Sequence, residues 1–416
     1  MRKLKIVHIQ KAVLSTGRAP LRLHNAFEEE NIESSILSMD FDVNLTDRVT
    51  EAGRKPRVIS RVHGFLHSFI TRKVKKKFGL FSFPILGSDI SDNKLIQEAD
   101  IIYIHWVQGG FLNLSGYRRI AKLGKPVVVF MHDMWTITGG CHHSFTCDKF
   151  KTKCFDCQMF PEKNLIDWPA IEFKRKLKLF KDFENLYFVS PSKWLFNCAK
   201  ESFLTREKPV FRIPNVIDNM LFKPLNKTVT RQILNLETDS TIIAFGAESI
   251  LSPYKGWTEL QKGLEILAKN QYLRNIIILI FGSGYNKQIA DSIPFKTRFL
   301  GFLKDEFSTS IVYNASDVFV TPSLADNLPT TILESLSCGT PVVGFEVGGI
   351  PDMIVHKKNG YLAKYRDAED LANGIRFCLE NNIKGHLLPE FERSLLIRQH
   401  MELMNTMISE KNKSPI

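Results

Sequence analysis

The sequence predicts an α/β protein made of two doubly wound domains, each built on a largely parallel sheet. The chain has 416 residues, which is more than one ordinary α/β core needs. Short apolar runs rich in β-branched residues are typical of strands buried on both faces. Longer helical patterns separate these runs, and the whole alternation occurs twice along the chain.

The strands and helices of this alternation can be placed in order. In the first half, strands are predicted at Leu4–Ile9, Ser35–Ser38, Ile101–His105, Pro126–His132, Leu186–Ser190 and Val210–Pro214. In the second half, they are predicted at Thr241–Gly246, Ile276–Gly282, Arg298–Gly301, Val318–Thr321, Pro341–Phe345 and Gly360–Ala363. Helices are predicted at Trp257–Lys269, Leu328–Ser337 and Ala368–Glu380.

A polar stretch after Asn219-Met-Leu-Phe-Lys-Pro224 separates the two series of strands. It predicts a first domain over residues 1–220 and a second over 221–385. Residues 386–416 are predicted to form a helix that packs back on the first domain.

Composition places the chain among globular proteins, with 44% hydrophobic and 24% charged residues. No run approaches the ~18 apolar residues of a membrane span, and polar residues interrupt the N-terminal apolar run. The sequence therefore predicts a cytoplasmic protein. Seven cysteines, an odd number, argue against a disulfide framework.

Residues 52–88 contain no Asp or Glu, although the chain as a whole has a formal net charge of +12. Apolar residues at helical spacing lie between the cations of this segment. A basic amphipathic helix would suit an anionic membrane surface and make the protein peripheral on the inner face, or it could be an ordinary surface helix. Nucleic acid is not expected as a partner, because no stacking or groove-reading motif accompanies the charge. The cations are Arg54, Lys55, Arg57, Arg61, Arg72, Lys73, Lys75, Lys76 and Lys77.

The segment Pro322–Val343 carries the strongest chemical signal. It contains a predicted strand end, a loop with Asp326, and a helix with Glu334 one to two turns along. A carboxylate can accept two hydrogen bonds from the vicinal hydroxyls of a sugar or ribose. Loop amides at the start of the helix can bind a diphosphate.

This segment resembles the signature of retaining glycosyltransferases of family 4 (glycosyl transferases group 1). That signature is an acid, seven residues, Glu, and then small residues followed by Cys-Gly-Thr-Pro-Val-Val. Many members have Glu at the first position, where this chain has Asp326. The resemblance implies the GT-B fold, in which two Rossmann-like domains face each other across a cleft. The first domain would bind the acceptor, and the second the nucleotide-sugar donor.

The resemblance also implies the donor-site residues. Asp326 would hold the sugar hydroxyls and Glu334 the ribose hydroxyls, and no Arg stands between Arg231 and Arg274, where the family usually adds one to the phosphate loop. The remaining donor-site residues are Gly17 of the first loop, Lys255 and Gly256 of the phosphate loop, Phe302 of the nucleobase segment, and Asn327 and Leu328 beside the acid.

His132 ends a predicted strand and matches the active-site histidine of these enzymes. A neutral imidazole there could hydrogen-bond a donor-sugar hydroxyl and so serve as a catalytic residue with Asp326 and Glu334. A lone histidine at a strand end can also be purely structural. His105-Trp106 resembles the subfamily of colanic acid and other exopolysaccharide enzymes.

Four cysteines follow His132 within a short loop: Cys141, Cys147, Cys154 and Cys157. They could hold a structural zinc ion or be packed free thiols, and their spacing fits no common zinc module. The resemblance implies donor chemistry that generally requires no metal, and no Asp-x-Asp motif is placed for a catalytic cation, so no cofactor and no catalytic metal are expected.

The resemblance implies a retaining hexosyltransferase of surface polysaccharide biosynthesis. The donor would be a UDP- or GDP-sugar, and the acceptor a saccharide or a lipid-linked molecule. Two alternatives stay open: a noncatalytic protein that binds nucleotide sugars or membranes on a GT-B scaffold, and a sugar-nucleotide epimerase.

Overall fold

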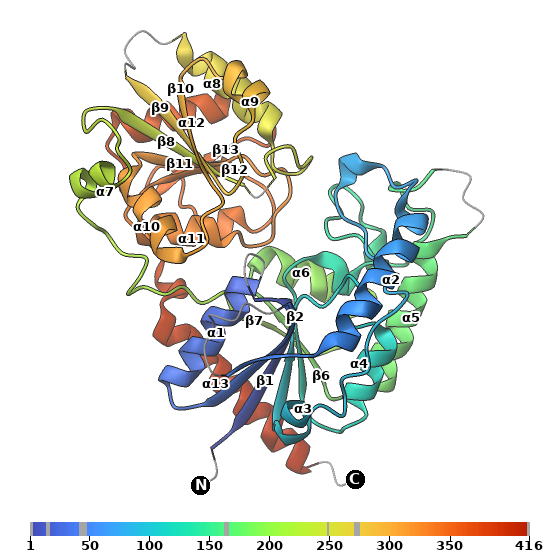
Figure 1. Ribbon diagram of the computed structural model, residues 1–416. Coiled ribbons are helices and arrows are strands. Elements are labelled where there is room, and N and C mark those ends of the chain that lie inside the picture. Colours follow the sequence, from blue (N-terminus) through green and yellow to red (C-terminus); the bar gives the residue numbers. More distant parts are fainter. Residues whose placement is uncertain are drawn as a thin grey trace. The chain divides into compact units, whose positions relative to one another are not determined.

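The computed structural model (Figure 1) describes residues 3–13, 17–40, 48–161, 166–247, 249–269 and 275–413. The chain forms two compact units. The first comprises Met1–Val216 with Ser394–Ile416, and the second comprises Ile217–Arg393. The sequence-based boundaries, 220/221 and 385/386, lie close to these transitions.

The first unit contains a seven-stranded sheet whose neighbouring strands all run parallel. The strand order is β3-β2-β1-β4-β5-β6-β7. The strands are β1 (Lys5–Ala12), β2 (Glu33–Asp40), β3 (Val49–Glu51), β4 (Ile101–Ile104), β5 (Val127–Phe130), β6 (Leu186–Ser190) and β7 (Val210–Arg212).

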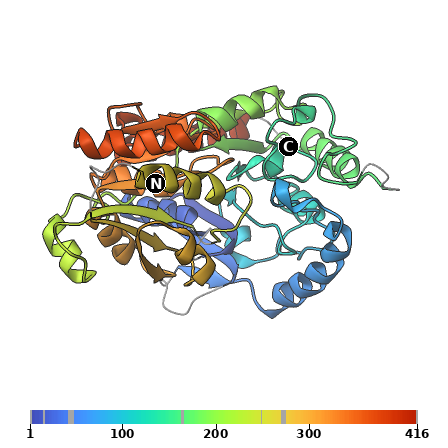
Figure 2. The same ribbon diagram turned by 90° about the horizontal axis from the view of Figure 1, so that it is seen from above.

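Helices cover both faces of this sheet and enclose two separate apolar clusters. The helices are α1 (Arg18–Glu29), α2 (Arg54–Thr71), α3 (Lys94–Glu98), α4 (Leu114–Ala121), α5 (Trp168–Asp182), α6 (Lys193–Glu201) and α13 (Arg393–Lys413). Side chains of α1 and α13 pack on one face, while those of α3, α4, α5 and α6 pack on the other. Helix α2 lies at the edge of the unit in the view of Figure 2. Short 3-10 turns occur at Lys76–Phe78, Met134–Ile137 and Lys149–Lys151.

The second unit contains a six-stranded parallel sheet in the order β10-β9-β8-β11-β12-β13. Its strands are β8 (Thr241–Gly246), β9 (Ile276–Phe281), β10 (Lys296–Gly301), β11 (Val318–Thr321), β12 (Val342–Phe345) and β13 (Gly360–Ala363). Its helices are α7 (Lys227–Ile233), α8 (Trp257–Ala268), α9 (Lys287–Ser292), α10 (Glu306–Ala315), α11 (Thr330–Ser337) and α12 (Ala368–Glu380), with 3-10 turns at Ile350–Asp352 and Pro389–Phe391. The predicted pair of doubly wound α/β domains is confirmed.

Both sheets share one topology, in which the chain builds outward from a central strand, returns, and builds toward the other edge. The direction reverses between β1 and β4 in the first unit and between β8 and β11 in the second. Helix N-termini and loop amides converge beyond the carboxyl ends of the strands at such a reversal, which is where α/β sheets bind ligands.

Some strand bounds differ from the sequence-based ones for clear reasons. Strand β1 continues to Ala12, past the polar residues that interrupt its apolar run, because His8 and Gln10 are buried within the sheet. Strand β7 ends at Arg212 rather than Pro214, since proline has no N–H to donate to the ladder. The short strand β3 was not predicted from the sequence, because three residues carry no periodicity.

Helix α13 supplies part of the core of the first unit. Its Leu396, Leu403, Met404 and Met407 lie in the apolar cluster with α1. Tyr103 Oη on β4 lies 3.2 Å from His400 Nδ1, which ties the helix to the centre of the sheet. No helix in the described ranges is long and apolar enough to cross a membrane.

This packing predicts unequal effects of two identical substitutions on α13. Met404 is 1% exposed and Met401 is 41% exposed. Met404→Ala should lower the free energy of unfolding by about 2–5 kcal/mol, because it leaves a cavity in the core. Met401→Ala should change it by no more than about 0.5 kcal/mol. Urea denaturation of both variants tests this, and equal losses would contradict the packing of α13.

Candidate active site

The carboxyl ends of β8 and β11 bring two of the predicted donor residues together. Lys255 lies in the loop between β8 and α8, and Asp326 lies in the loop between β11 and α11. The two strands are neighbours, so their loops meet. A backbone hydrogen bond from Leu324 N–H to the Tyr254 carbonyl, 2.7 Å, joins the loops directly.

Lys255 and Asp326 form an ion pair, with Lys255 Nζ 3.0 Å from Asp326 Oδ2. Their side chains are 29% and 18% exposed, so the pair is partly shielded from solvent. The backbone N–H of Asn327 donates to Asp326 Oδ1 at 3.0 Å, and Ser323 Oγ donates to Oδ2 at 3.4 Å. Both oxygens of the carboxylate are therefore oriented by neighbouring donors.

Glycines allow three loops to approach closely around this pair. Gly256 has φ +66°, and a Cβ there would lie 1.8 Å from the Pro322 carbonyl oxygen. Gly348, after β12, has φ +57°, and a Cβ there would lie 2.0 Å from the Asp326 carbonyl oxygen. A side chain at either position would force the loops apart.

Helices α8 and α11 begin at this edge, and neither has a side-chain cap within the described residues. Gly256 and Pro329 occupy the two N-cap positions. By contrast, side-chain oxygens of Asn226, Asp305 and Asp367 cap α7, α10 and α12. The first backbone N–H groups of α8 and α11 thus lack the side-chain acceptor that their neighbours have, which suits an anionic ligand.

Glu334 lies on α11, eight positions after Asp326, and is 5% exposed. Tyr313 on α10 is fully buried, and its hydroxyl donates to Glu334 Oε2 at 3.0 Å. The predicted positions of Asp326 in the loop and Glu334 in the helix are confirmed. The sequence did not predict the phenol that orients Glu334.

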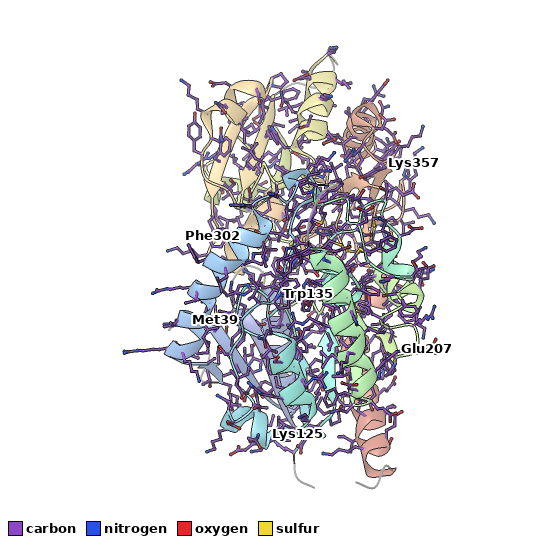
Figure 3. The ribbon with its side chains drawn as sticks, turned by 90° about the vertical axis from the view of Figure 1, so that its right-hand side faces the viewer. Met39, Lys125, Trp135, Glu207, Phe302 and Lys357 are labelled. Carbon is purple, nitrogen blue, oxygen red and sulfur yellow. The ribbon has the colours of Figure 1, made fainter. Side chains whose placement is uncertain are left out.

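The other predicted donor residues differ in placement. Phe302, which is labelled in Figure 3, directly follows β10. Its side chain is 48% exposed. Asn327 and Leu328 are buried, and Leu328 packs in an apolar cluster. A ligand would meet Leu328 through its backbone rather than its side chain.

Gly17 lies in the first unit at the N-cap of α1. A Cβ at Gly17 would lie 1.9 Å from the Ala12 carbonyl oxygen, so only glycine fits this approach of α1 to the end of β1. The preceding Ser15 and Thr16 of the predicted loop lie outside the described residues.

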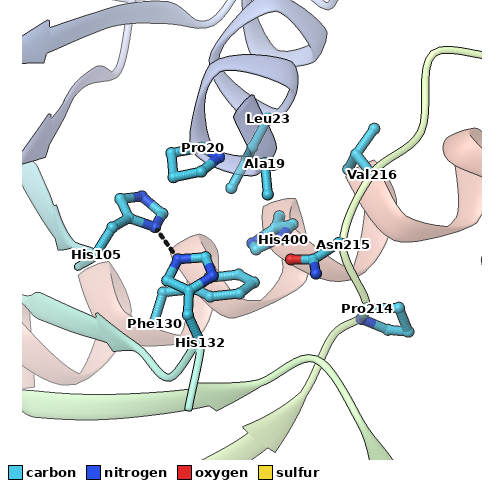
Figure 4. Close-up of a pocket in the computed structure, with 10 residues that line it drawn as sticks. All are labelled: Ala19, Pro20, Leu23, His105, Phe130, His132, Pro214, Asn215, Val216 and His400. Carbon is cyan, nitrogen blue, oxygen red and sulfur yellow. Dashed lines mark hydrogen bonds between the residues drawn. The ribbon is translucent and has the colours of Figure 1, made fainter. Parts of the chain in front are cut away.

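His132 belongs to a chain of three histidines on neighbouring strands, with His8 within β1, His105 directly after β4 and His132 shortly after β5. His8 Nδ1 lies 2.9 Å from His105 Nε2, and His105 Nδ1 lies 3.0 Å from His132 Nε2. Figure 4 shows the second of these hydrogen bonds. The sequence singled out His132 and missed its link to His8. Two-residue alternation on three strands puts the three rings on one face and could have indicated it.

Burial keeps these histidines neutral. Burial lowers the pKa of His132 to about 4, and it lowers the pKa values of His8 and His105 well below the ordinary range. A neutral imidazole has one N–H and one acceptor nitrogen. The two hydrogen bonds must therefore run in the same direction along the chain, which couples the tautomer of His132 to that of His8.

A small pocket in the first unit lies beside His132 (Figure 4). It combines apolar side chains with imidazoles and one amide. Its lining is Ala19, Pro20, Leu23, His105, Phe130, His132, Pro214, Asn215, Val216 and His400.

Asp133, the neighbour of His132, is held in place by contacts to Trp135 and His142. It accepts a hydrogen bond from the Trp135 N–H at 2.7 Å, and its Oδ2 lies 2.6 Å from His142 Nδ1. Although burial opposes ionisation, these contacts hold the pKa of Asp133 below its ordinary value. The fully buried Lys176 lies over the ring of Trp135 (labelled in Figure 3) and donates to its carbonyl, so the turn after His132 is tightly held.

The four loop cysteines are free thiols, and burial raises the pKa values of Cys141, Cys154 and Cys157. Cys154 Sγ accepts a hydrogen bond from the Gly139 N–H at 3.3 Å. Within the described ranges, no group of three or more His, Cys, Asp or Glu side chains is arranged to hold a metal ion. Zinc at this loop stays a prediction.

A known protein family matches the sequence of the second unit. Residues 226–393 match the model of the family Glycosyl transferases group 1. This segment holds the Lys255–Asp326 pair and Glu334. The matched residues lie entirely within the second compact unit.

Relatives of known sequence match over a similar part of the chain. An uncharacterized glycosyltransferase of Haemophilus influenzae is 27% identical over 186 residues, covering 44% of this chain and 50% of the relative. The Escherichia coli UDP-Gal:alpha-D-GlcNAc-diphosphoundecaprenol alpha-1,3-galactosyltransferase is 27% identical over 187 residues, covering 43% and 47%. The chain therefore spans about half the length of the curated relatives it matches.

Solved structures match over nearly the whole chain. Anabaena Alr3699/HepE, in complex with UDP and glucose, has a TM-score of 0.60 and 17% identity, covering 99% of this chain and 100% of that chain. At this identity the likeness shows the fold alone. The chain has the two Rossmann-like α/β domains of GT-B glycosyltransferases.

The buried histidines predict that the first unit loses stability in mild acid. Besides the three in the chain, burial lowers the pKa values of His24 and His63 to about 4 and of His400 to about 3. Their ordinary value is 6.5, so below that pH the unfolded chain binds more protons than the folded one. Stability is present above pH 6.5 and is lost as pH falls toward 4, at about 1.4 kcal/mol per histidine per pH unit.

The urea midpoint, followed between pH 6.5 and about 5, tests this before most carboxylates titrate. Histidine Cε1–H resonances should show the six rings unprotonated across that window. A midpoint that stays constant or rises on acidification would contradict the assignment.

Proposed function

We propose that this protein is a glycosyltransferase that moves a sugar from a nucleoside diphosphate sugar to an acceptor hydroxyl. The observation that carries the proposal is the Lys255–Asp326 ion pair at the carboxyl ends of β8 and β11, followed by Glu334 on α11. The family match over residues 226–393 supports it independently of the geometry.

Each part of this edge fits one part of the donor. The Lys255 ammonium and the first N–H groups of α8 and α11 would neutralise the diphosphate. The Asp326 carboxylate would accept hydrogen bonds from sugar hydroxyls, and Glu334 would accept them from the ribose. Because Tyr313 already orients one Glu334 oxygen, the carboxylate needs little reordering to bind the ribose.

The reaction breaks the bond between the anomeric carbon and the diphosphate oxygen, and forms a bond from that carbon to the acceptor oxygen. The acceptor proton passes to the departing diphosphate. Negative charge grows on the leaving group in the transition state, where Lys255 and the helix N-termini would stabilise it. We assign the chain to family 4 and infer retention of configuration with a hexose donor, which follows from the resemblance of the Asp326–Glu334 segment. The assignment of His132 as a third catalytic residue stays a prediction.

The relatives suggest the substrates. HepE binds UDP in its crystals, and the Escherichia coli relative is named for a UDP-galactose donor and an undecaprenol-linked acceptor. We infer a UDP-sugar or GDP-sugar donor and a saccharide or lipid-linked acceptor. We also infer that the protein acts in surface or exopolysaccharide biosynthesis. We further infer that it attaches peripherally to the inner face of a membrane.

Removing the Lys255 cation should slow transfer by about a hundredfold or more in kcat, because a preorganised charge then no longer meets the leaving diphosphate. The variant is Lys255→Met, and the assay is release of nucleoside diphosphate on mixing donor and acceptor. Lys262→Met on α8 is the matched control, since Lys262 is exposed on the same helix. Its rate should stay within about twofold of wild type.

A Glu334→Gln variant separates function from folding, because glutamine keeps the shape and still accepts from Tyr313. It should lose transfer while keeping its melting temperature within a few degrees of wild type. Transfer near the wild-type rate in both Lys255→Met and Glu334→Gln would refute the site. Nucleotide binding without any transfer would favour a noncatalytic binding protein.

A further inference from the structure

Helix α2 is amphipathic in the reverse of the usual sense, because its apolar stripe faces solvent. Val58, Val62, Phe65 and Phe69 follow one another at spacings of four, three and four residues, which is one side of a helix. They are 57%, 49%, 73% and 66% exposed. Only Pro56 and His63 of this helix are buried.

The inward side of α2 is polar and makes specific hydrogen bonds. Ser60 Oγ donates to the Gly109 carbonyl at 2.6 Å. His63 Nδ1 accepts from the Leu86 N–H at 3.3 Å, and His67 Nε2 accepts from the Phe83 N–H at 3.2 Å. These contacts fix the rotation of the helix, so the apolar stripe cannot turn inward without breaking them.

Cations flank the stripe, and acidic groups are scarce around it. Residues 52–88 contain no Asp or Glu. Of the cations here whose side chains are described, only Arg57 forms an ion pair, with Glu51 Oε1 at 3.0 Å. The guanidinium of Arg72 lies 4.6 Å from the ring centre of Phe69, which places charge beside the stripe. The exposed cations are Arg54, Lys55, Arg57, Arg61, Arg72, Lys73, Lys75 and Lys77.

We propose that the outward face of α2, with Phe65 and Phe69 at its centre and the cations beside it, docks on the surface of an anionic lipid bilayer. Aromatic and aliphatic side chains at this level of exposure would enter the boundary between headgroups and acyl chains. Lys and Arg would meet lipid phosphates, and the long side chains can reach the headgroup plane. Charge complementarity selects this occupant, because a face with this density of cations repels a second copy of itself.

The inference develops the membrane attachment within the proposed function. Vesicle binding needs neither donor nor acceptor, so its failure would leave the transfer reaction standing. Failure of transfer would likewise leave the docking face intact.

The experiment uses the full chain and vesicles of equal parts phosphatidylcholine and phosphatidylglycerol, with phosphatidylcholine vesicles for comparison. The chain should sediment with the anionic vesicles and not with the neutral ones. A Lys55→Gln, Lys73→Gln, Lys75→Gln variant should lose about a hundredfold in partitioning, and added salt should have the same effect. The control Lys122→Gln, Lys174→Gln, Lys178→Gln, of equal charge change at exposed sites of the same unit, should bind like wild type.

A Phe65→Ser, Phe69→Ser variant tests the apolar part and should lose about tenfold or more. Its control is Ile233→Ser, Phe307→Ser, at 56% and 57% exposure in the second unit. In Phe65→Trp, the emission of the new indole should shift to shorter wavelength on adding anionic vesicles. No binding to anionic vesicles, or equal binding by the α2 variants and wild type, would overturn the proposal. So would a dimer that Phe65→Ser, Phe69→Ser dissociates, or binding of nucleic acid in place of vesicles.

Discussion

The ion pair between Lys255 and Asp326 is the interaction on which the candidate donor site depends. It joins the loops that follow β8 and β11, at the point where the second sheet reverses direction. Gly256 and Gly348 have no side chain, so their backbone can lie close to the carbonyl groups of Pro322 and Asp326 around this pair. Without a ligand, each group compensates the charge of the other in a partly shielded position. A donor would exchange this internal compensation for contacts to its diphosphate and hydroxyls, so the site is ordered before it is filled.

The strands and the positions of Asp326 and Glu334 could be predicted from the sequence, because the patterns that indicate them are local. β-branched runs gave the strands, and the spacing of Asp326 and Glu334 put one acid in a loop and the other on a helix. The Lys255–Asp326 contact is less local, since it depends on β8 and β11 being neighbours across the reversal. Strand order of this kind follows from the doubly wound topology rather than from any one motif.

The contacts that were not predicted from the sequence join residues far apart along the chain. Tyr313 orients Glu334 from another helix, and His8 reaches His132 through His105 across three strands. The Tyr313 contact follows from no sequence spacing, and the histidine contacts follow from two-residue alternation only once the strand order β1-β4-β5 is known. The rotation of α2 is a similar case. Its amphipathic pattern was legible, but the usual assumption that an apolar stripe faces the core fails, because Ser60, His63 and His67 hold the polar side inward.

Calorimetric titration of UDP into wild type, Lys255→Met, Asp326→Asn and the double variant tests the central claim most directly. UDP lacks the sugar that is transferred, so Asp326 should affect its affinity only by positioning Lys255. Lys255→Met should weaken UDP binding by about tenfold or more, and adding Asp326→Asn to it should change nothing further. Strictly additive effects, or UDP binding of equal strength in all four proteins, would contradict the account.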